Sequence, residues 1–453
     1  MAEFEQLALF PHVSQKQLTP DNNLLKINGD MGTFKDNMQA PIHSWFRYPA
    51  GYSYKFVNVI FDHFGIQTGD WIYDPFSGTG TTLVCAKQRG IHGYGVEAHS
   101  FVHWIADVKL QWNYEFNQLR NDLEPLFKRA QRFVREHIET VKIENVFPEL
   151  IYKCYHLQDL KELYLLREFI LHEVIDYDVQ QLLKLALTDN LRNAAAAGTG
   201  WPYIAPNKNT GDKPAKGAAN LFEKRAWKMY SDLWEINRST SSKAEIINVL
   251  GDSRTQQKLE NEQIKLALTS PPYLNNYDYA DRTRLETYFW GITQSWRDIT
   301  EMYRNHLMVA ATTQIVRRDY VVETALTSEI QAIAPDVYDT IQDAVLQLAD
   351  LRLQKGGKKD YDLMVALYFN DILLVIQETY RVLRRGGYFC VVLGDSAPYG
   401  VHIQTEELIG KLGLAIGFSH YEYQQLRTRG GKWKDNPQRH TVPLREGVVI
   451  LTR

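Results

Sequence analysis

Cysteine is scarce in this chain, which has three in 453 residues: Cys85, Cys154 and Cys390. Their separations match no zinc or disulfide framework, so we expect neither a metal site nor a disulfide scaffold. Cys85 falls in an expected helix and Cys390 in an expected strand. We therefore expect the thiols to be buried and reduced, as they are in cytoplasmic proteins.

Long apolar runs and an excess of one charge are also lacking. No apolar run reaches the ~18 residues of a membrane span, and the N-terminus has no signal-peptide pattern, so no membrane partner is expected. The net charge is only −3, so any nucleic-acid binding depends on local basic patches. With 44% hydrophobic residues, the chain can form one large domain with added lobes, but its oligomeric state is not predicted.

A strand followed by a glycine turn stands early in the chain. The apolar run 71–73 ends at Asp74, residues 75–80 include Gly78 and Gly80, and residues 81–87 have helix-forming composition. This order predicts the first strand–helix unit of a doubly wound sheet, in which ligands lie at the carboxyl ends of the strands. The two glycines allow positive φ and close backbone approach, and the helix N-terminus favours a carboxylate ligand.

Two further acidic residues are expected at strand ends. Glu97 closes the apolar run 94–97, at about the ~20-residue spacing of a ribose-binding carboxylate. Asp252 follows a third expected strand, 246–250. Together with Asp74, these residues predict a polar cluster at one edge of the sheet.

A dinucleotide-binding oxidoreductase is the rival interpretation of the glycine turn. Gly78 and Gly80 begin a G-x-G-x-x-G pattern, but Leu83 occupies the third glycine position. The helix must pack closely against the strand there, so a leucine disfavours the dinucleotide form.

A second motif, Thr269-Ser270-Pro271-Pro272-Tyr273, follows the apolar run 266–268. Pro271 fixes its own φ and restricts Ser270 before it, and neither proline has an N–H. The motif is therefore a rigid corner whose carbonyl groups are available as acceptors. An isolated proline-rich turn or recognition ligand is disfavoured because the run ends a strand in a globular core.

The two motifs together resemble the cofactor and catalytic loops of the S-adenosylmethionine-dependent DNA amino-methyltransferases. The S-P-P-Y form resembles the branch that methylates the exocyclic N4 of cytosine, whereas the adenine-N6 branch usually has Asp or Asn in place of Ser270. The resemblance covers roughly 41–112, 246–295 and 375–453. It implies an α/β fold: a Rossmann-like class I methyltransferase sheet with helical insertions.

The resemblance implies S-adenosyl-L-methionine as cofactor. Glu97 would accept hydrogen bonds from the two ribose hydroxyls, Asp252 would lie near the adenine amino group, and the segment 46–53 would cover the methionine end. The expected cofactor-binding residues are Tyr48, Tyr52, Ser53, Asp74, Phe76, Gly78, Gly80, Glu97 and Asp252.

The implied chemistry is methylation of an aromatic amino group, which is a poor nucleophile because its lone pair is delocalised. The Ser270 hydroxyl and the Pro271 carbonyl would accept its two N–H bonds and direct the lone pair at the methyl group. Tyr273 would stack on the extruded base. The expected catalytic residues are Ser270, Pro271, Pro272 and Tyr273.

Other activities remain open at this point. No cysteine follows a proline in a loop, as the nucleophile of a cytosine-C5 methyltransferase would, so covalent attack on the ring is disfavoured. An adenine-N6 DNA methyltransferase, an RNA base methyltransferase and a catalytically inactive nucleic-acid-binding protein of the same fold are the alternatives. The intact motifs and Glu97 disfavour the inactive protein.

The expected organisation contains two insertions. About 130 residues separate the second expected strand from the third, and apolar residues recur at helical spacing in 119–141 and 157–187. The expected parts are an N-terminal extension (1–40), the donor-binding core (41–112), a mostly helical insertion that is the candidate target-recognition region (113–245), the catalytic-loop core (246–295), a second helical insertion (296–377) and a C-terminal core with a DNA-facing loop (378–453).

Double-stranded DNA is the expected partner, held by local cations. The favoured patch lies before the last expected strand, 447–451, and combines cations with Trp433 and glycines; segments 208–228 and 352–359 are further basic stretches. Its expected DNA-binding residues are Arg427, Arg429, Lys432, Lys434 and Arg439. The chain shows no nuclease motif, so an accompanying restriction nuclease would be a separate protein.

Overall fold

A central β-sheet organises the part of the chain that the computed structural model describes, residues 29–199, 204, 214–239, 243–275, 277–429 and 442–453. Within these residues the sheet has seven strands in the order β3-β2-β1-β4-β5-β7-β6. The strands are β1 (Trp71–Asp74), β2 (His92–Glu97), β3 (Ile246–Leu250), β4 (Ile264–Thr269), β5 (Leu383–Gly394), β6 (His420–Arg429) and β7 (Leu444–Thr452). The first five in this order are parallel, and β7 is antiparallel to both of its neighbours.

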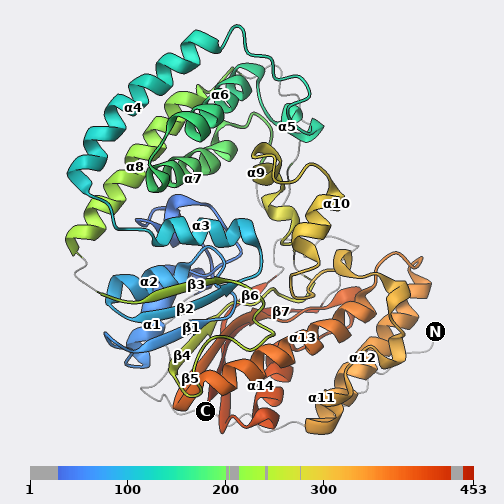
Figure 1. Cartoon of the computed structure of the whole chain (residues 1–453). Coiled ribbons are helices and arrows are strands. Elements are labelled where there is room, and N and C mark those ends of the chain that lie inside the picture. The colour runs from blue at the N-terminus through green and yellow to red at the C-terminus, as the bar shows by residue number, and fades with distance from the viewer. Residues whose placement is uncertain (1–28, 200–203, 205–213, 240–242, 276, 430–441) are drawn as a thin grey trace.

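Apolar side chains on the strands alternate between two cores, one on each face of the sheet. Ile72 of β1 belongs to one core and Tyr73 to the other, as the two-residue period of a strand requires. The first core includes α1 (Tyr54–His63), α2 (Thr81–Arg89) and α3 (Ser100–Leu110), and the second includes α13 (Tyr361–Val382) and α14 (Thr405–Ile416). These three layers confirm the expected class I methyltransferase architecture (Figure 1).

The glycine turn joins β1 to α2 at the carboxyl edge of the sheet. Gly78 and Gly80 have φ values of 53° and 81°, a backbone conformation that residues other than glycine rarely adopt. A Cβ on Gly80 would also lie 3.3 Å from Cβ of Ala106, so this glycine lets α2 pack close to α3. The expected strand–turn–helix unit is therefore present.

A group of helices occupies the stretch between β2 and β3, on the far side of α3 from the sheet (Figure 1). It contains α4 (Phe116–His137), α5 (Glu149–Cys154), α6 (Leu157–Glu173), α7 (Tyr177–Ala194) and α8 (Ala218–Ser239). The helical pattern expected over 157–187 is divided in two, because Asp176 caps α7 by accepting a hydrogen bond from the Val179 N–H.

The stretch between β4 and β5 is less helical than expected. It holds α9 (Arg284–Phe289), α10 (Trp296–Ile299), a π-helical turn (Thr300–Arg304), α11 (Ser328–Ile333), α12 (Pro335–Gln354) and α13. Residues 306–327 are mostly irregular, with three 3₁₀ turns. All 3₁₀ turns of the described chain are Gly29–Gly32, Asp36–Met38, His43–Trp45, Asp281–Thr283, Thr312–Gln314, Arg317–Asp319, Val322–Thr324 and Pro398–Gly400.

Helix α13 is the one helix among the described residues that is long and apolar enough to cross a membrane. Its apolar window is 67% buried within the protein, and its side chains fill the core on one face of the sheet. Its apolar character thus belongs to a core helix.

The edge strand β6 was not expected from the sequence. We expected a loop over 427–434, but Arg427 and Arg429 belong to the end of this strand. None of its residues is fully buried, so its sequence lacks the apolar alternation that marks the other strands.

Candidate active site

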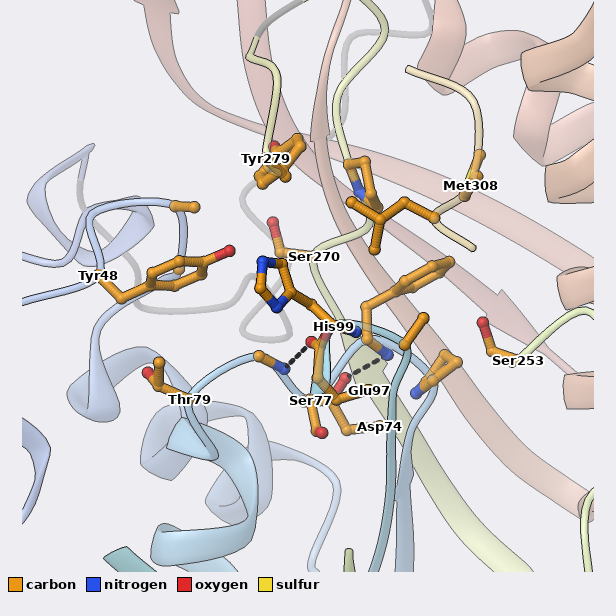
Figure 2. A pocket seen from close by; sticks show the side chains of 18 of the residues that line it. Tyr48, Asp74, Ser77, Thr79, Glu97, His99, Ser253, Ser270, Tyr279 and Met308 are labelled. Carbon is orange, nitrogen blue, oxygen red and sulfur yellow. Dashed lines mark hydrogen bonds between the residues drawn. The ribbon is translucent and has the colours of Figure 1, made fainter. Parts of the chain in front are cut away.

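A cavity of about 1010 Å³ lies at the carboxyl ends of the parallel strands (Figure 2). Four segments distant in sequence form most of its wall: residues 48–52, the glycine turn, the catalytic motif and residues 306–314. Nine of the expected site residues line it: Tyr48, Tyr52, Asp74, Phe76, Gly78, Glu97, Asp252, Ser270 and Pro272.

The buried carboxylate of Asp74 connects the glycine turn to the catalytic motif. Its Oδ1 accepts hydrogen bonds from the Thr269 hydroxyl at 2.7 Å and the Phe76 N–H at 3.1 Å. Its Oδ2 accepts from the Thr82 hydroxyl at 2.7 Å and the Tyr52 hydroxyl at 3.2 Å. Burial raises the pKa of Asp74, although these hydrogen bonds oppose the shift. One carboxylate thus holds both halves of the site.

Glu97 ends β2 with its carboxylate on the cavity wall. Oε2 accepts from the Gly78 N–H at 3.0 Å, and Oε1 accepts from the His99 N–H at 2.7 Å. Burial raises the pKa of Glu97 to about 7, and the two backbone hydrogen bonds oppose this rise. The carboxylate is therefore oriented by backbone amides and keeps acceptor capacity towards the cavity.

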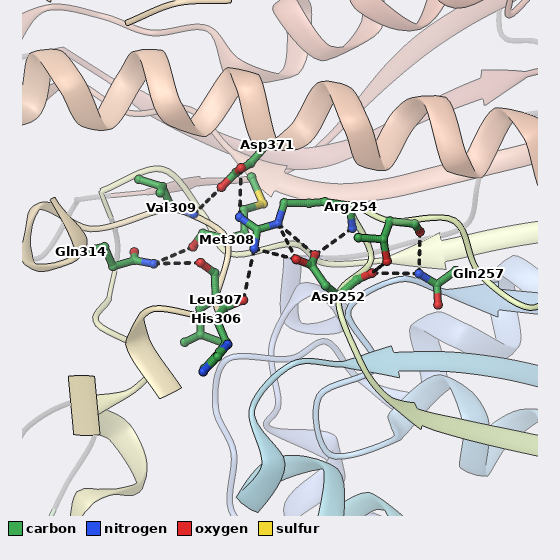
Figure 3. Close-up of polar contacts among 10 residues, drawn as sticks. Asp252, Arg254, Gln257, His306, Leu307, Met308, Val309, Gln314 and Asp371 are labelled. Atoms are coloured by element: carbon green, nitrogen blue, oxygen red, sulfur yellow. Dashed lines mark hydrogen bonds and ion pairs between the residues drawn. The ribbon is translucent and has the colours of Figure 1, made fainter. Parts of the chain in front are cut away.

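Asp252 forms a network with Arg254 and Asp371 (Figure 3). The Arg254 guanidinium donates to both Asp252 oxygens, at 2.7 Å from Nη2 to Oδ2 and 2.9 Å from Nε to Oδ1. Its Nη1 donates to Asp371 Oδ1 at 3.0 Å. Burial alone would raise the pKa of Asp252, but the hydrogen bonds from Arg254 hold it below its usual value.

The same network holds residues 306–314 against the cavity (Figure 3). Asp371 Oδ2 accepts from the Val309 N–H at 2.8 Å, and Arg254 Nη2 donates to the His306 carbonyl at 3.3 Å. The Gln314 side chain accepts from the Ala310 and Ala311 N–H groups and donates to the Leu307 and Met308 carbonyls. His306, Leu307, Met308 and Gln314 consequently line the wall beside Asp252.

The catalytic motif presents Ser270 and Pro272 to the cavity, but not Tyr273. Tyr273 is only 9% exposed, and the guanidinium of Arg429 lies 5.4 Å from its ring centroid. The Ser270 hydroxyl donates to the Tyr273 hydroxyl at 3.4 Å. Tyr273 therefore supports Ser270 from behind, and the expected stacking surface lies outside the cavity.

Three other expected residues also lie off the cavity wall. The Ser53 hydroxyl caps α1 by accepting from the Lys55 N–H, and it donates to Asp36. Gly80 begins α2, and Pro271 is buried behind Ser270 and Pro272.

Several lining residues were missed from the sequence. His99, which stacks on Tyr303 with ring centroids 3.9 Å apart, has its pKa lowered by burial to about 3 and is neutral. Tyr279 could have been predicted from the sequence, because Tyr277 and Tyr279 are two aromatic residues a few positions after the catalytic motif. The lining residues outside the expected segments are Ala98, His99, Asp278, Tyr279, His306, Leu307, Met308 and Gln314, whereas Ala50, Gly51, Pro75, Ser77, Thr79, Thr81, Gly251 and Ser253 belong to the expected cofactor and strand-end segments.

The two described arginines of the expected DNA patch form ion pairs. Arg427 Nη2 lies 2.9 Å from Glu446 Oε1, and Arg429 Nε lies 3.8 Å from Glu446 Oε2, while the Glu446 side chain is 3% exposed. The positive charges of Arg427 and Arg429 are thus partly used to compensate the buried Glu446 carboxylate. Lys432, Lys434 and Arg439 lie outside the described residues.

The basic segment 208–228 also contributes internal contacts. Lys216 Nζ donates to the carbonyls of Asn193 and Ala195, and Arg225 Nε lies 2.8 Å from Asp189 Oδ2. Lys228 pairs with the buried Asp232. Lys208 and Lys213 lie outside the described residues.

The chain is similar to proteins named type II methyltransferases over most of its length. It is 24% identical to M.BsoBI of Geobacillus stearothermophilus over 93% of this chain and 88% of that protein. It is 23% identical to M.AvaI of Anabaena variabilis over 88% of this chain and 83% of the relative. M.MvaI of Kocuria varians is 21% identical over 84% of each protein. No family model matches the chain.

Proposed function

We propose that this chain, whose relatives are type II methyltransferases, transfers a methyl group from S-adenosyl-L-methionine to the exocyclic N4 of cytosine in DNA. The observation that carries the proposal is one cavity lined by both Glu97 and Ser270. A donor site and an acceptor for an amino group thus share one space.

The residues present fit the methyl donor. The cavity is lined by polar groups from the strand ends and by an apolar wall, which suits a nucleoside. Glu97, with oxygens oriented by Gly78 and His99, would hold the ribose hydroxyls. Met308 and Leu307 offer an apolar wall beside Asp252 for the adenine ring. The positive φ of Gly78 brings backbone close to the cavity at the start of α2, which suits the carboxylate of the methionine part.

Ser270 would orient the reacting nitrogen. The bound donor supplies an electrophilic sulfonium methyl group. The Ser270 hydroxyl donates a hydrogen bond to the Tyr273 hydroxyl, so its lone pairs are free to accept an N–H of the target amino group. The resemblance also implies the Pro271 carbonyl as a second acceptor, but Pro271 does not line the cavity, so Ser270 is the acceptor that the geometry supports. The protein then works by positioning and electrostatics.

Cytosine is favoured as the target base by the serine of the S-P-P-Y motif. Adenine N6 is the second candidate, because the relatives are type II methyltransferases without a base in their names and a hydroxyl serves either amino group as acceptor. An RNA base is the third. We further propose double-stranded DNA as the partner, the segments 113–245 and 427–439 as its contacts, a separate restriction nuclease, and a cytoplasmic location.

Mass spectrometry of nucleosides tests the proposal. Unmethylated genomic DNA is incubated with the protein and methyl-labelled donor, digested and analysed. A labelled N4-methylcytosine nucleoside supports the proposal, and a labelled N6-methyladenine nucleoside supports the second candidate. A Ser270→Ala, Glu97→Gln double variant serves as the inactive control. A parallel reaction contains RNA in place of DNA. Absence of any labelled nucleoside from DNA, with label in the RNA reaction, would overturn the choice of DNA.

A further inference from the structure

Two tyrosines near the catalytic motif differ in the surface they offer to a ligand. Tyr273 is packed into the core of one sheet face, with Arg429 over its ring. Tyr279 is half-buried and lines the cavity, near Ser270 and away from Glu97 and Asp74 (Figure 2). A planar base entering beside Ser270 therefore meets the ring of Tyr279.

Tyr279 is held in this position through its own hydroxyl and its neighbour. The Tyr279 hydroxyl accepts from the Tyr273 N–H at 3.4 Å, which joins the outer ring to the catalytic motif. Asp278 Oδ1 accepts from the N–H groups of Ala280 and Asp281, at 3.2 and 3.3 Å. Asp278 thereby holds the backbone that follows Tyr279.

Asp278 is in turn fixed by the stretch between β4 and β5. Its Oδ2 accepts from Arg304 Nη2 at 2.7 Å and Nε at 3.0 Å, and from the Thr313 hydroxyl at 3.0 Å. The Arg304 side chain is 7% exposed, so this charge pair is well shielded from water. The loop that carries Tyr279 is thus attached to the π-helical turn Thr300–Arg304 and to the 3₁₀ turn Thr312–Gln314.

We propose that Tyr279 supplies the aromatic face on which the target base stacks, and that Asp278 and Thr313 are positioning residues for it. This inference rests on the proposed function. An extruded base loses its stacking in the duplex, and an aromatic side chain replaces it. Loss of such a face reduces binding roughly ten- to a hundredfold.

Substitution of Tyr279 tests the aromatic role. With plasmid DNA that the wild-type enzyme methylates, Tyr279→Leu is expected to lower kcat/KM for DNA roughly ten- to a hundredfold. Tyr279→Phe keeps the ring and should lose much less. Calorimetric affinity for S-adenosylmethionine should stay close to that of wild type in both. Tyr320→Leu, at an exposed position off the cavity wall, is the matched control.

Three results would overturn the aromatic role. The first is a wild-type rate of methyl transfer by Tyr279→Leu. The second is an equal loss of kcat/KM in Tyr279→Phe, which would assign the effect to the hydroxyl. The third is a fall in donor affinity by the same factor as transfer, which would place Tyr279 in the donor site. If the wild-type enzyme methylates no DNA, the proposed function fails first, so the two failures are distinguishable.

The positioning role has a separate readout. Thr313→Val removes one hydrogen bond to Asp278 at an exposed position and should lower kcat/KM a fewfold in the wild-type background. In the Tyr279→Leu background the same change should have no further effect, because the ring it positions is absent. An equal effect in both backgrounds would show that Thr313 does not act through Tyr279.

Discussion

The guanidinium of Arg254 lies against both carboxylate oxygens of Asp252, with three hydrogen bonds of 2.7–3.1 Å. The same side chain also reaches Asp371, so it joins the loop after β3 to helix α13. Asp252 can therefore contact a ligand only in the orientation that Arg254 imposes. The orientation of Asp252 on the cavity wall thus depends on a residue whose side chain does not line the cavity.

Replacement of Arg254 should weaken donor binding. Arg254→Ala removes the group that orients Asp252 and leaves the largely buried Asp371 without its charged partner. Hydrogen bonds to charged groups contribute about 1.5–3 kcal/mol, so we expect the donor affinity to fall roughly ten- to a hundredfold. Titration calorimetry measures the affinity. Arg254→Lys keeps the charge but not the planar fork and should recover only part of it. Arg297→Ala, which breaks an exposed ion pair with Glu301, is the control.

Donor affinity should rise with pH through the titration of Glu97. Its pKa of about 7 in the free protein means that much of it is protonated at pH 6 and ionised at pH 8. The ionised form is the stronger acceptor for two hydroxyls, so calorimetric affinity should increase between these values and then level off. Glu97→Gln should bind the donor more weakly, with no such rise. Equal pH profiles for the two proteins would contradict the assignment.

The same group makes stability depend on pH in the opposite direction. The pKa of Glu97 is raised on folding from the ordinary 4.5 to about 7, so the native state binds more protons between these values. The stability that protonated Glu97 contributes is present below about pH 4.5 and is lost as pH rises through 7. As the pH rises from about 4.5 to 7, the melting temperature of the free wild-type protein should therefore fall relative to that of Glu97→Gln.

Ser270 should matter for transfer more than for donor binding. Ser270→Ala removes one acceptor for the amino group, and we expect a roughly tenfold to hundredfold lower single-turnover rate, with donor affinity nearly unchanged. Ser419→Ala, at an exposed hydroxyl that bonds the Thr452 carbonyl, is the control. Tyr273→Ala is unsuited to this comparison because loss of a buried aromatic ring costs about 3–5 kcal/mol of stability.

The cations of 427–439 should be tested in two groups. Arg427→Ala leaves the nearly buried Glu446 with Arg429 at 3.8 Å, so we expect lower stability in thermal unfolding before any effect on DNA. Lys432, Lys434 and Arg439 changed together to Ala should reduce the slope of log DNA affinity against log salt by about 0.9 for each phosphate that these side chains neutralise. A change of slope only in a Lys208→Ala, Lys213→Ala protein would move the DNA-binding surface to the first insertion.

Residues adjacent to strand ends could be predicted from the sequence because local geometry determines where they lie. Glu97 ends one strand and Ser270 follows another, and parallel strands bring their carboxyl ends together. The expected first and second strand–turn units are present, and the three cysteines are buried and unpaired as expected.

The remaining wall of the cavity could not be predicted in this way. Met308 and Gln314 reach it through interactions of Arg254 and Asp371 that join distant segments, and no local pattern encodes such interactions. The motif drew attention to Tyr273, but its burial and the position of Tyr279 depend on packing. Strand β6 was not predicted from the sequence because an edge strand with partly exposed side chains shows little apolar alternation.

The shared carboxylate of Asp74 has a consequence for how the two reactants affect each other. Thr269 and Tyr52 both donate hydrogen bonds to Asp74, which begins the glycine turn. We therefore expect that a ligand that orders one of these loops also restricts the other. The two affinities are then thermodynamically linked, and linkage is reciprocal. Whatever factor the methyl donor adds to the affinity for DNA, DNA must add to the affinity for the donor, and Asp74→Asn should reduce both factors equally.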